Sequence, residues 1–295
     1  MIEAYCKQFF GYGRWDAPVW FVGLEEAGAG TQEELQTRLR AWDQCGRREL
    51  EDAPSFYPAC GQHQWHGQNA TLQHTWRRLI RVLLLARGEP VAADTLLDFQ
   101  KHALGASFGQ VCLTELFPLP APNHLQWPYE CHEDLPAWMR NREQFMQTIL
   151  PGRASMLREK IALHHPRAVV FYFWKPRSLA EAVAGGEFKP VIPEKLLGLE
   201  HNGTAYFIIG HPAGKYPDGY FDGLGQYFHE RCRDIFADGA IHVQRIHQVR
   251  PGRRRIFRRA KRGTPSNDDN VKNSKNALDA DTITLYGVAP MVPTH

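Results

Sequence analysis

The sequence predicts an α/β fold, a three-layer sandwich with a four-stranded parallel sheet, and three observations lead to this prediction. Four short apolar runs are continuous rather than alternating, which is typical of strands that are covered on both faces. Stretches of helical periodicity separate these runs. The chain has 295 residues, of which 43% are hydrophobic, so it can bury a sizeable core. The predicted strands comprise residues 19–23, 111–116, 168–173 and 205–209.

Helical stretches lie between the predicted strands, in the order that an α/β sandwich requires. Residues 72–86 carry apolar side chains at helical spacing and end at Gly88, a residue type that commonly terminates helices. Residues 140–164 contain Pro151 and Gly152, so we expect two helices that meet at this point. Further helices are expected at residues 33–40, 92–104 and 223–236.

Two segments depart from this pattern, an insertion and a tail. Within a domain of residues 1–238, residues 31–70 are too irregular for a simple crossover, and we interpret them as an insertion over one end of the sheet. Packing of its aromatic side chains is the simplest expectation, although they could also cover a pocket. Periodicity fades in residues 239–295, which we interpret as a basic, flexible tail.

Charge is divided unevenly between the body and this tail. The formal net charge is only +3, because a net of −4 over residues 1–240 is offset by a net of +7 over residues 241–295. Of the 13 residues from 250 to 262, 8 are Lys or Arg. This distribution excludes a uniformly basic surface for binding nucleic acid, but it leaves room for a local basic site.

The composition also bears on membrane insertion, on the cellular compartment and on metal binding. We expect no membrane span and no secretion signal, because no apolar run is long enough. The 6 cysteines are scattered without a Cys-x-x-Cys pair, which favours reduced thiols and a cytoplasmic protein. The spacing of Cys60, His63 and His66, even with Cys45 as a fourth ligand, is not a standard zinc pattern. We therefore predict no metal and no cofactor, and no obligatory protein partner is evident.

Polar and aromatic residues follow each predicted strand. The carboxyl ends of parallel strands form one rim, and ligands of open α/β sheets bind there. We therefore take these residues together as candidates for a functional site. They are Glu25, Glu26 and Ala27 after the first strand, Thr114, Glu115 and Asn123 at the second, Trp174, Lys175 and Arg177 at the third, and His211, Lys215 and Tyr216 at the fourth.

In this order, the four segments resemble the motifs of the uracil-DNA glycosylase superfamily. The Gly-Leu-Glu-Glu of residues 23–26 resembles its water-activating loop, and the His-Pro-Ala of residues 211–213 resembles its His-Pro-Ser motif. Trp174 matches the aromatic residue that often ends the third strand in that family. The likeness covers about residues 15–237. It implies a four-stranded parallel sheet between helices, and an enzyme that hydrolyses a base–sugar bond in DNA. Some branches of the superfamily hold an iron–sulfur cluster with four cysteines, and because this chain lacks the required cysteine spacing we predict no cluster.

The residues suit this chemistry in their own right. Cleavage of an N-glycosidic bond builds positive charge on the sugar and negative charge on the base, so a carboxylate can orient water and a donor can hold the leaving base. Glu25 is our candidate for the carboxylate, with Glu26 as the close alternative because the register is uncertain by one residue. His211 is our candidate for the donor. The two acids could instead lie in a solvated turn, and the histidine could be a buried one that the backbone satisfies.

Contacts to DNA are expected along the same rim, because a base in a duplex must leave the stack to be reached. Lys215 and Tyr216 follow the His-Pro-Ala where family members carry a loop that enters the minor groove. Lys175 and Arg177 are further candidates for phosphate contacts, unless they are ordinary surface charges. The tail would add affinity that depends on salt and not on base sequence, unless it has no role in binding.

Two departures from the uracil-specific pattern concern the base. Ala27 stands where uracil-specific members carry a Tyr that excludes a 5-substituent. Thr114 and Glu115 stand where the family often has an Asn, and a carboxylate can accept from the exocyclic amine of cytosine. Asn123 could supply an amide instead. These changes favour a 5-modified pyrimidine, such as a modified cytosine of phage DNA, and thus a role in phage defence. Excision of uracil or a deaminated base in repair, and a non-catalytic module that binds modified DNA, are the alternatives.

Overall fold

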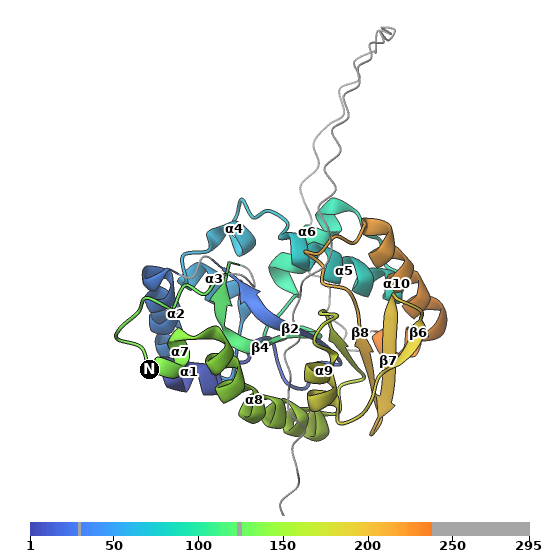
Figure 1. The fold of residues 1–295 in the computed structure, drawn as a ribbon. Helices are drawn as coiled ribbons and strands as arrows, with labels where there is room; N and C mark the ends of the chain where they lie inside the picture. Colours follow the sequence, from blue (N-terminus) through green and yellow to red (C-terminus); the bar gives the residue numbers. More distant parts are fainter. Residues whose placement is uncertain (29–30, 123–125, 238–295) are drawn as a thin grey trace, which may run out of the picture. The chain divides into compact units, whose positions relative to one another are not determined.

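A mixed sheet of eight strands forms the centre of the described residues, in the order β3-β1-β4-β2-β5-β8-β7-β6 (Figure 1). The computed structural model describes residues 1–28, 31–122 and 126–237, which fall within one unit of the chain, Met1–Ala240. Asn123 and the predicted tail therefore lie outside the described residues. The strands are β1 (Gly11–Tyr12), β2 (Val19–Ala27), β3 (Leu50–Glu51), β4 (Val111–Ala121), β5 (Ala168–Phe171), β6 (Lys189–Ile192), β7 (Leu196–His201) and β8 (Thr204–Ile208).

The four predicted strands correspond to β2, β4, β5 and β8, which pair in parallel with one another. Val19 at the start of β2 lies opposite Val111 of β4 on one side and Ala168 of β5 on the other, and Ala168 lies opposite Ala205 of β8. Most side chains of these strands are buried, which explains the continuous apolar runs. The sheet as a whole is larger than the predicted four strands, and it is mixed rather than purely parallel.

The four unpredicted strands extend the sheet at its two edges. β1 pairs antiparallel with β4 and parallel with β3, while β7 pairs antiparallel with β8 and β6. β1 and β3 have only 2 residues each, too few to show a periodicity. The hairpin of β6 and β7 is partly exposed and carries polar residues, so it contains no continuous apolar run.

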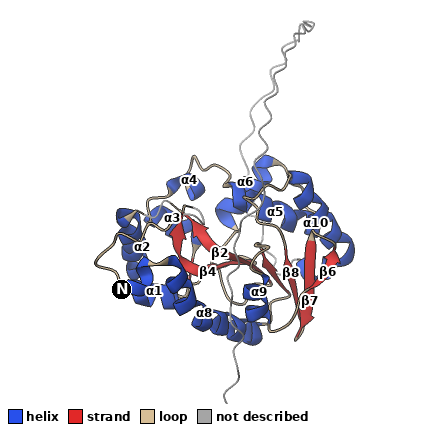
Figure 2. Cartoon of the chain, viewed as in Figure 1, coloured by secondary structure: helices blue, strands red, loops and turns tan. Residues whose placement is uncertain are grey.

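Helices cover both sides of this sheet. Figure 1 shows α5, α6 and α10 on one side and α1, α8 and α9 on the other, and Figure 2 shows the strands between the two groups of helices. The helices are α1 (Ile2–Gln8), α2 (Gln32–Gln44), α3 (Ala53–Ala59), α4 (His63–His66), α5 (His74–Arg87), α6 (Ala93–His102), α7 (Ala137–Arg140), α8 (Arg142–His164), α9 (Arg177–Ala184), α10 (Asp218–Arg231) and α11 (Arg233–Phe236).

Helix ends follow local signals in the sequence. α2 begins at a capping box, in which Thr31 accepts from the backbone of Glu34 and the Glu34 side chain accepts from the backbone of Thr31. α5 ends at Gly88, whose φ of 75° is the left-handed conformation that glycine adopts without strain. The single helix expected at residues 223–236 is two helices, α10 and α11, and α10 begins earlier than expected.

The expected break at Pro151 does not occur, because α8 is one helix of 23 residues. Pro151 and Gly152 are exposed, so the missing backbone hydrogen bond lies on the solvent side. The opposite face buries Phe145, Ile149 and Arg153 among others, and this packing keeps the helix continuous. Although α8 is long, no helix in the described residues is apolar enough to cross a membrane.

The aromatic side chains of the insertion pack into the core. Trp42 and Phe56 have no exposed surface and Tyr57 is 2% exposed, while Trp65 packs against the core from its edge. The expectation of packing is thus confirmed. The ring of His66 lies 5.4 Å from that of Tyr57, and no group of three or more metal-ligating side chains gathers in the described residues.

Glu51 makes the stability of the fold depend on pH. Glu51 is 2% exposed, and burial raises the pKa of its carboxyl to about 7. Between pH 4.5 and about 7 the folded protein keeps a proton that the unfolded chain has released, so stability falls as pH rises through this window. Glu51→Gln has no carboxyl to ionise and so avoids this fall in stability. We expect the substitution to raise the free energy of unfolding by about 2 kcal/mol at pH 8.

Urea denaturation at several pH values measures this effect. The increase in the free energy of unfolding that Glu51→Gln causes should be absent near pH 4, grow up to about pH 7 and then level off. A gain that does not change with pH would show that Glu51 titrates at the same pH in the folded and unfolded chains.

Candidate active site at the carboxyl ends of the strands

The carboxyl ends of the four parallel strands meet where the strand order reverses. From β2 the chain crosses to β4 on one side, and it then passes β2 to reach β5 on the other side. The crevice outside β2 and β5 is therefore the topological switch point, the place where open α/β sheets bind ligands. Gly23 of β2, Glu115 of β4 and Tyr172 after β5 meet there.

Gly23 leaves the space that this cluster occupies. A Cβ atom on Gly23 would overlap with Oε2 of Glu115 and with the hydroxyl of Tyr172. The Tyr172 hydroxyl donates to Oε1 of Glu115, whereas Oε2 is shielded from solvent and has no hydrogen-bond partner among the described residues. Burial raises the pKa of the Glu115 carboxyl well above its ordinary value. The hydrogen bond from Tyr172 and the charge of Arg153 oppose this shift, while the charges of Glu26 and Glu25 add to it.

Glu26 is held in a network of four hydrogen bonds. Both guanidinium nitrogens of Arg38 donate to its two oxygens at 2.8 Å, Tyr57 donates to Oε1 at 2.7 Å and Tyr12 donates to Oε2 at 2.9 Å. Bidentate pairs of this kind are strong and fixed in geometry. The network joins α2 and α3 of the insertion to the end of β2, so Glu26 has a structural role here.

Glu25 has different partners from its neighbour. It belongs to β2, opposite Phe117 of β4, and the guanidinium of Arg142 at the start of α8 donates to its Oε1. Arg142 in turn lies over the ring of Trp127, with 5.4 Å between the guanidinium carbon and the ring centroid. The Glu25 side chain is 16% exposed, so it borders solvent. Because β2 extends to Ala27, both acids are strand residues rather than part of a solvated turn.

His211 lies in a turn that its own ring helps to close. Its Nδ1 accepts a hydrogen bond from the backbone N–H of Ala213 at 3.1 Å, so the proton of the neutral ring is on Nε2. Burial lowers the pKa of His211 from its ordinary value of 6.5, which keeps the ring neutral at pH 7. The ring lies against Tyr172, with 5.9 Å between centroids. Arg78 of α5 donates to the carbonyl of Pro212 and holds the same turn.

The remaining residues predicted for the site make contacts of their own, apart from the cluster of Gly23, Glu115 and Tyr172. Trp174 packs at the edge of the core, and Arg177 pairs with Glu181 at 2.8 Å within α9. Thr114 has no exposed surface, and its hydroxyl lies 3.5 Å from the carbonyl oxygen of Phe21. Ala27 is the last residue of β2 and pairs with Ala121.

Tyr216 packs inward at the end of β8. Its ring stacks on Tyr220 with 4.5 Å between centroids, and it covers Gly210, where a Cβ atom would overlap with it. Tyr216 thus fills space inside this turn. Lys215 beside it and Lys175 after β5 are exposed.

The structure therefore brings Glu25, Glu115 and His211 to one rim and adds residues that the sequence did not suggest. Tyr172 links Glu115 to His211, but in the sequence it belongs to the apolar run of the third strand. Arg142 reaches Glu25 across 117 residues of sequence, and no local pattern predicts that contact.

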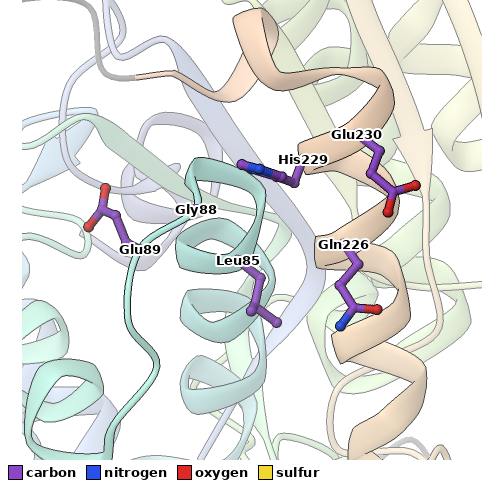
Figure 3. A pocket seen from close by; sticks show the side chains of 6 residues that line it. All are labelled: Leu85, Gly88, Glu89, Gln226, His229 and Glu230. Carbon is purple, nitrogen blue, oxygen red and sulfur yellow. The ribbon is translucent and has the colours of Figure 1, made fainter.

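A pocket of about 270 Å³ lies elsewhere, between the C-terminal ends of α5 and α10 (Figure 3). The N-terminal ends of both helices lie near the rim, because Arg78 contacts Pro212 and Asp218. Each helix has 14 residues, which places the pocket about 20 Å along the helices from the rim. The pocket is lined by Leu85, Gly88, Glu89, Gln226, His229 and Glu230.

Comparison with known proteins finds no matching family model and no match among curated proteins.

Substitution of Gly23 tests the geometry of the rim. We expect Gly23→Ala to lower the free energy of unfolding by about 2 kcal/mol, because its Cβ atom must displace the Glu115 carboxyl and the Tyr172 hydroxyl. The matched control is Gly223→Ala on the exposed side of α10, where a Cβ atom meets nothing within 4 Å. This control should gain up to about 1 kcal/mol, since alanine favours helices. Equal stability of Gly23→Ala and the unsubstituted protein in urea denaturation would contradict this description.

Proposed function

We propose that this chain is a DNA glycosylase that hydrolyses the N-glycosidic bond of a flipped, 5-modified pyrimidine. The observation that carries the proposal is the placement of Glu25 and a neutral His211 on the rim that surrounds the switch point. The order of the four parallel strands, the resemblance of their end motifs to the uracil-DNA glycosylase superfamily and the helices on both sides of the sheet support it.

Glu25 is the acid that we assign to water activation. Cleavage gives the sugar the character of an oxocarbenium ion, and a carboxylate stabilises this cation while it orients the attacking water. Arg142 favours the ionised form of Glu25, which the reaction needs. The alternative, Glu26, has both oxygens engaged by Arg38, Tyr12 and Tyr57 and serves the fold instead.

His211 is assigned to the leaving base. As the bond breaks, negative charge develops on an oxygen of the base, and a preorganised donor at that oxygen stabilises the transition state. The backbone bond to Nδ1 leaves Nε2–H as the donor of the neutral ring. No proton has to be lost or gained for this hydrogen bond to form, so the group is ready at neutral pH.

The identity of the base follows from what borders the site. Ala27 stands where uracil-specific members of that superfamily carry a tyrosine, and the lack of a ring at this position of the sequence favours a pyrimidine with a 5-substituent. Glu115 supplies a polar group for the base edge. Bases of this kind occur in the decorated DNA of phages, so we propose a role in phage defence.

Lys175 and Lys215 are the exposed cations that we assign to DNA phosphates near the rim. Phosphate contacts position a protein on DNA and make its affinity dependent on salt. The basic residues 250–262 would extend this contact along the duplex.

A base-release assay tests the proposal and separates its alternatives. The substrates are matched duplexes that carry uracil, cytosine, 5-methylcytosine, 5-hydroxymethylcytosine or glucosylated 5-hydroxymethylcytosine at one position. We expect release of a 5-modified cytosine. Release of uracil alone would make the protein a repair enzyme, and release of no base with retained DNA binding would favour a non-catalytic module.

Glu25→Gln should lower the rate of base release about a thousandfold while DNA binding stays intact, because it removes the charge but keeps the shape. The matched control is Glu200→Gln at an exposed position of β7, which should retain full activity. If Glu25→Gln is as active as the control, Glu25 does not activate the water.

His211→Ala should lower the rate about a hundredfold, as loss of one donor to a developing anion typically does. Protonation of the histidine would put a second proton on Nδ1, against the N–H of Ala213. Because burial lowers the pKa of His211 below its ordinary value of 6.5, activity of the unsubstituted protein should persist at pH 6.5 and fall only in more acidic buffer. A steep loss of base release centred at or above pH 6.5 would contradict this assignment.

A further inference from the structure

The turn that carries His211 is held from outside by the guanidinium of Arg78. This arginine belongs to α5 and is 8% exposed. Its Nη1 donates to the backbone carbonyl of Pro212 and, at 3.4 Å, to that of Gly214. Pro212 is buried, and a buried carbonyl without a donor costs free energy. The turn is therefore more stable while this carbonyl faces Arg78.

The carbonyl of Pro212 and the N–H of Ala213 are two ends of one peptide group. That N–H donates to Nδ1 of the His211 ring at 3.1 Å, and the N–H of Gly214 closes the turn by donating to the carbonyl of His211 at 2.8 Å. Because a trans peptide group is planar, its C=O and N–H point in opposite directions. A guanidinium that fixes the C=O of this peptide thus also aims its N–H at the histidine ring.

Arg78 is itself held in place from α10. Its Nε donates to Oδ1 of Asp218 at 3.0 Å, and its guanidinium carbon lies 4.9 Å from the centroid of the Phe221 ring. Helices α5 and α10 pack against each other on one side of the sheet (Figure 1). Because a guanidinium is a rigid planar fork, its contacts with Asp218 and Phe221 also set the direction of the N–H that meets Pro212.

We propose that Arg78 is a positioning residue, which holds the peptide between Pro212 and Ala213 in the orientation that keeps the proton of the neutral His211 ring on Nε2. Its importance for base release rests on the proposed glycosylase function, whereas its control of the ring does not.

Loss of Arg78 frees this peptide to rotate. The C=O of Pro212 then faces Nδ1, where it accepts a hydrogen bond only if Nδ1 carries the proton. The ring releases the Nε2 proton to water, takes up another on Nδ1 and stays neutral. Nε2 is then an acceptor, and an acceptor repels the negative charge that develops on the leaving base.

Nitrogen-15 nuclear magnetic resonance of the full-length protein, labelled at the histidine rings, reports the position of the proton without reference to activity. The buffer is above pH 7, where His211 is neutral because burial lowers its pKa. The signals that His211→Ala removes belong to His211. We expect the proton on Nε2 in the unsubstituted protein. In Arg78→Met, which keeps an apolar stem but has no donor, we expect the Nδ1 signal to move toward the position of a protonated nitrogen.

The matched control is Arg77→Met. Arg77 donates to the same Asp218 carboxylate at 3.0 Å, but no hydrogen bond joins it to residues 211–214 in the described part of the chain. This variant should keep the ring signals of the unsubstituted protein. If Arg78→Met does not fold, Arg78→Lys replaces it. Lysine keeps the charge beside Asp218 but lacks the rigid fork, so part of the same shift is expected.

Base release at saturating DNA tests the consequence for the reaction. Arg78→Met should lower kcat about tenfold with KM unchanged, because a misplaced donor is missed in the transition state and not in binding. A residue that only stabilised the fold would leave both kcat and the ring signals unchanged at a temperature where the variant is folded. Arg77→Met should have the unsubstituted kcat.

Unchanged His211 signals in Arg78→Met, or in Arg78→Lys where it replaces that variant, would overturn the inference. An equal shift in Arg77→Met would do so as well, because it would place the effect in the pairing with Asp218. A shifted ring with full kcat would refute the importance of Arg78 for base release. If the ring shifts but the unsubstituted protein releases no base from any DNA, the proposed function is wrong and the control of the ring by Arg78 stands.

Discussion

The geometry of the rim depends on one buried cation, Arg153. It has 2% exposure, and its guanidinium donates to four backbone carbonyls, those of Glu115, Leu116, Cys6 and Phe9. These carbonyls belong to β4 and to the end of α1, so a single α8 side chain joins three elements. Burial lowers the pKa of Arg153 to about 10, which still leaves it charged at neutral pH. Charged donors form the stronger hydrogen bonds, and this one fixes the backbone that carries Glu115.

Three acids near Arg153 differ in their hydrogen-bond partners and in their surroundings. Glu26 is immobilised by Arg38, Glu25 is paired with Arg142 at the border of solvent, and Glu115 is half-buried beside a tyrosine. Neighbouring residues of a strand point to opposite faces, so Glu25 meets α8 while Glu26 meets the insertion. Enzymes use such differences to give similar side chains separate roles. The division of labour proposed here is of that kind.

The sequence predicted the centre of the fold well and its edges poorly. Buried parallel strands such as β5 are continuous apolar runs, which are visible without a structure. Strands of 2 residues such as β1 owe their existence to pairing with β4, which no local pattern reports. Pro151 was misjudged because the packing of the opposite helix face, Arg153 included, outweighs the local cost. The candidate acids and His211 were found from their place after strands, but Tyr172 and Arg142 act through long-range contacts.

The charge of the body constrains how a glycosylase of this design would hold DNA. Arginines near the rim are paired with acids, Arg38 with Glu26, Arg142 with Glu25 and Arg78 with Asp218. These pairs stabilise the fold and the site, but they add little net attraction for phosphates. Attraction to the backbone must therefore come from outside the reacting centre, and the 8 basic residues between 250 and 262 hold the largest concentration of positive charge in the chain. Catalysis would thus rely on the paired acids of the rim, whereas binding would rely on Lys175, Lys215 and the basic residues 250–262.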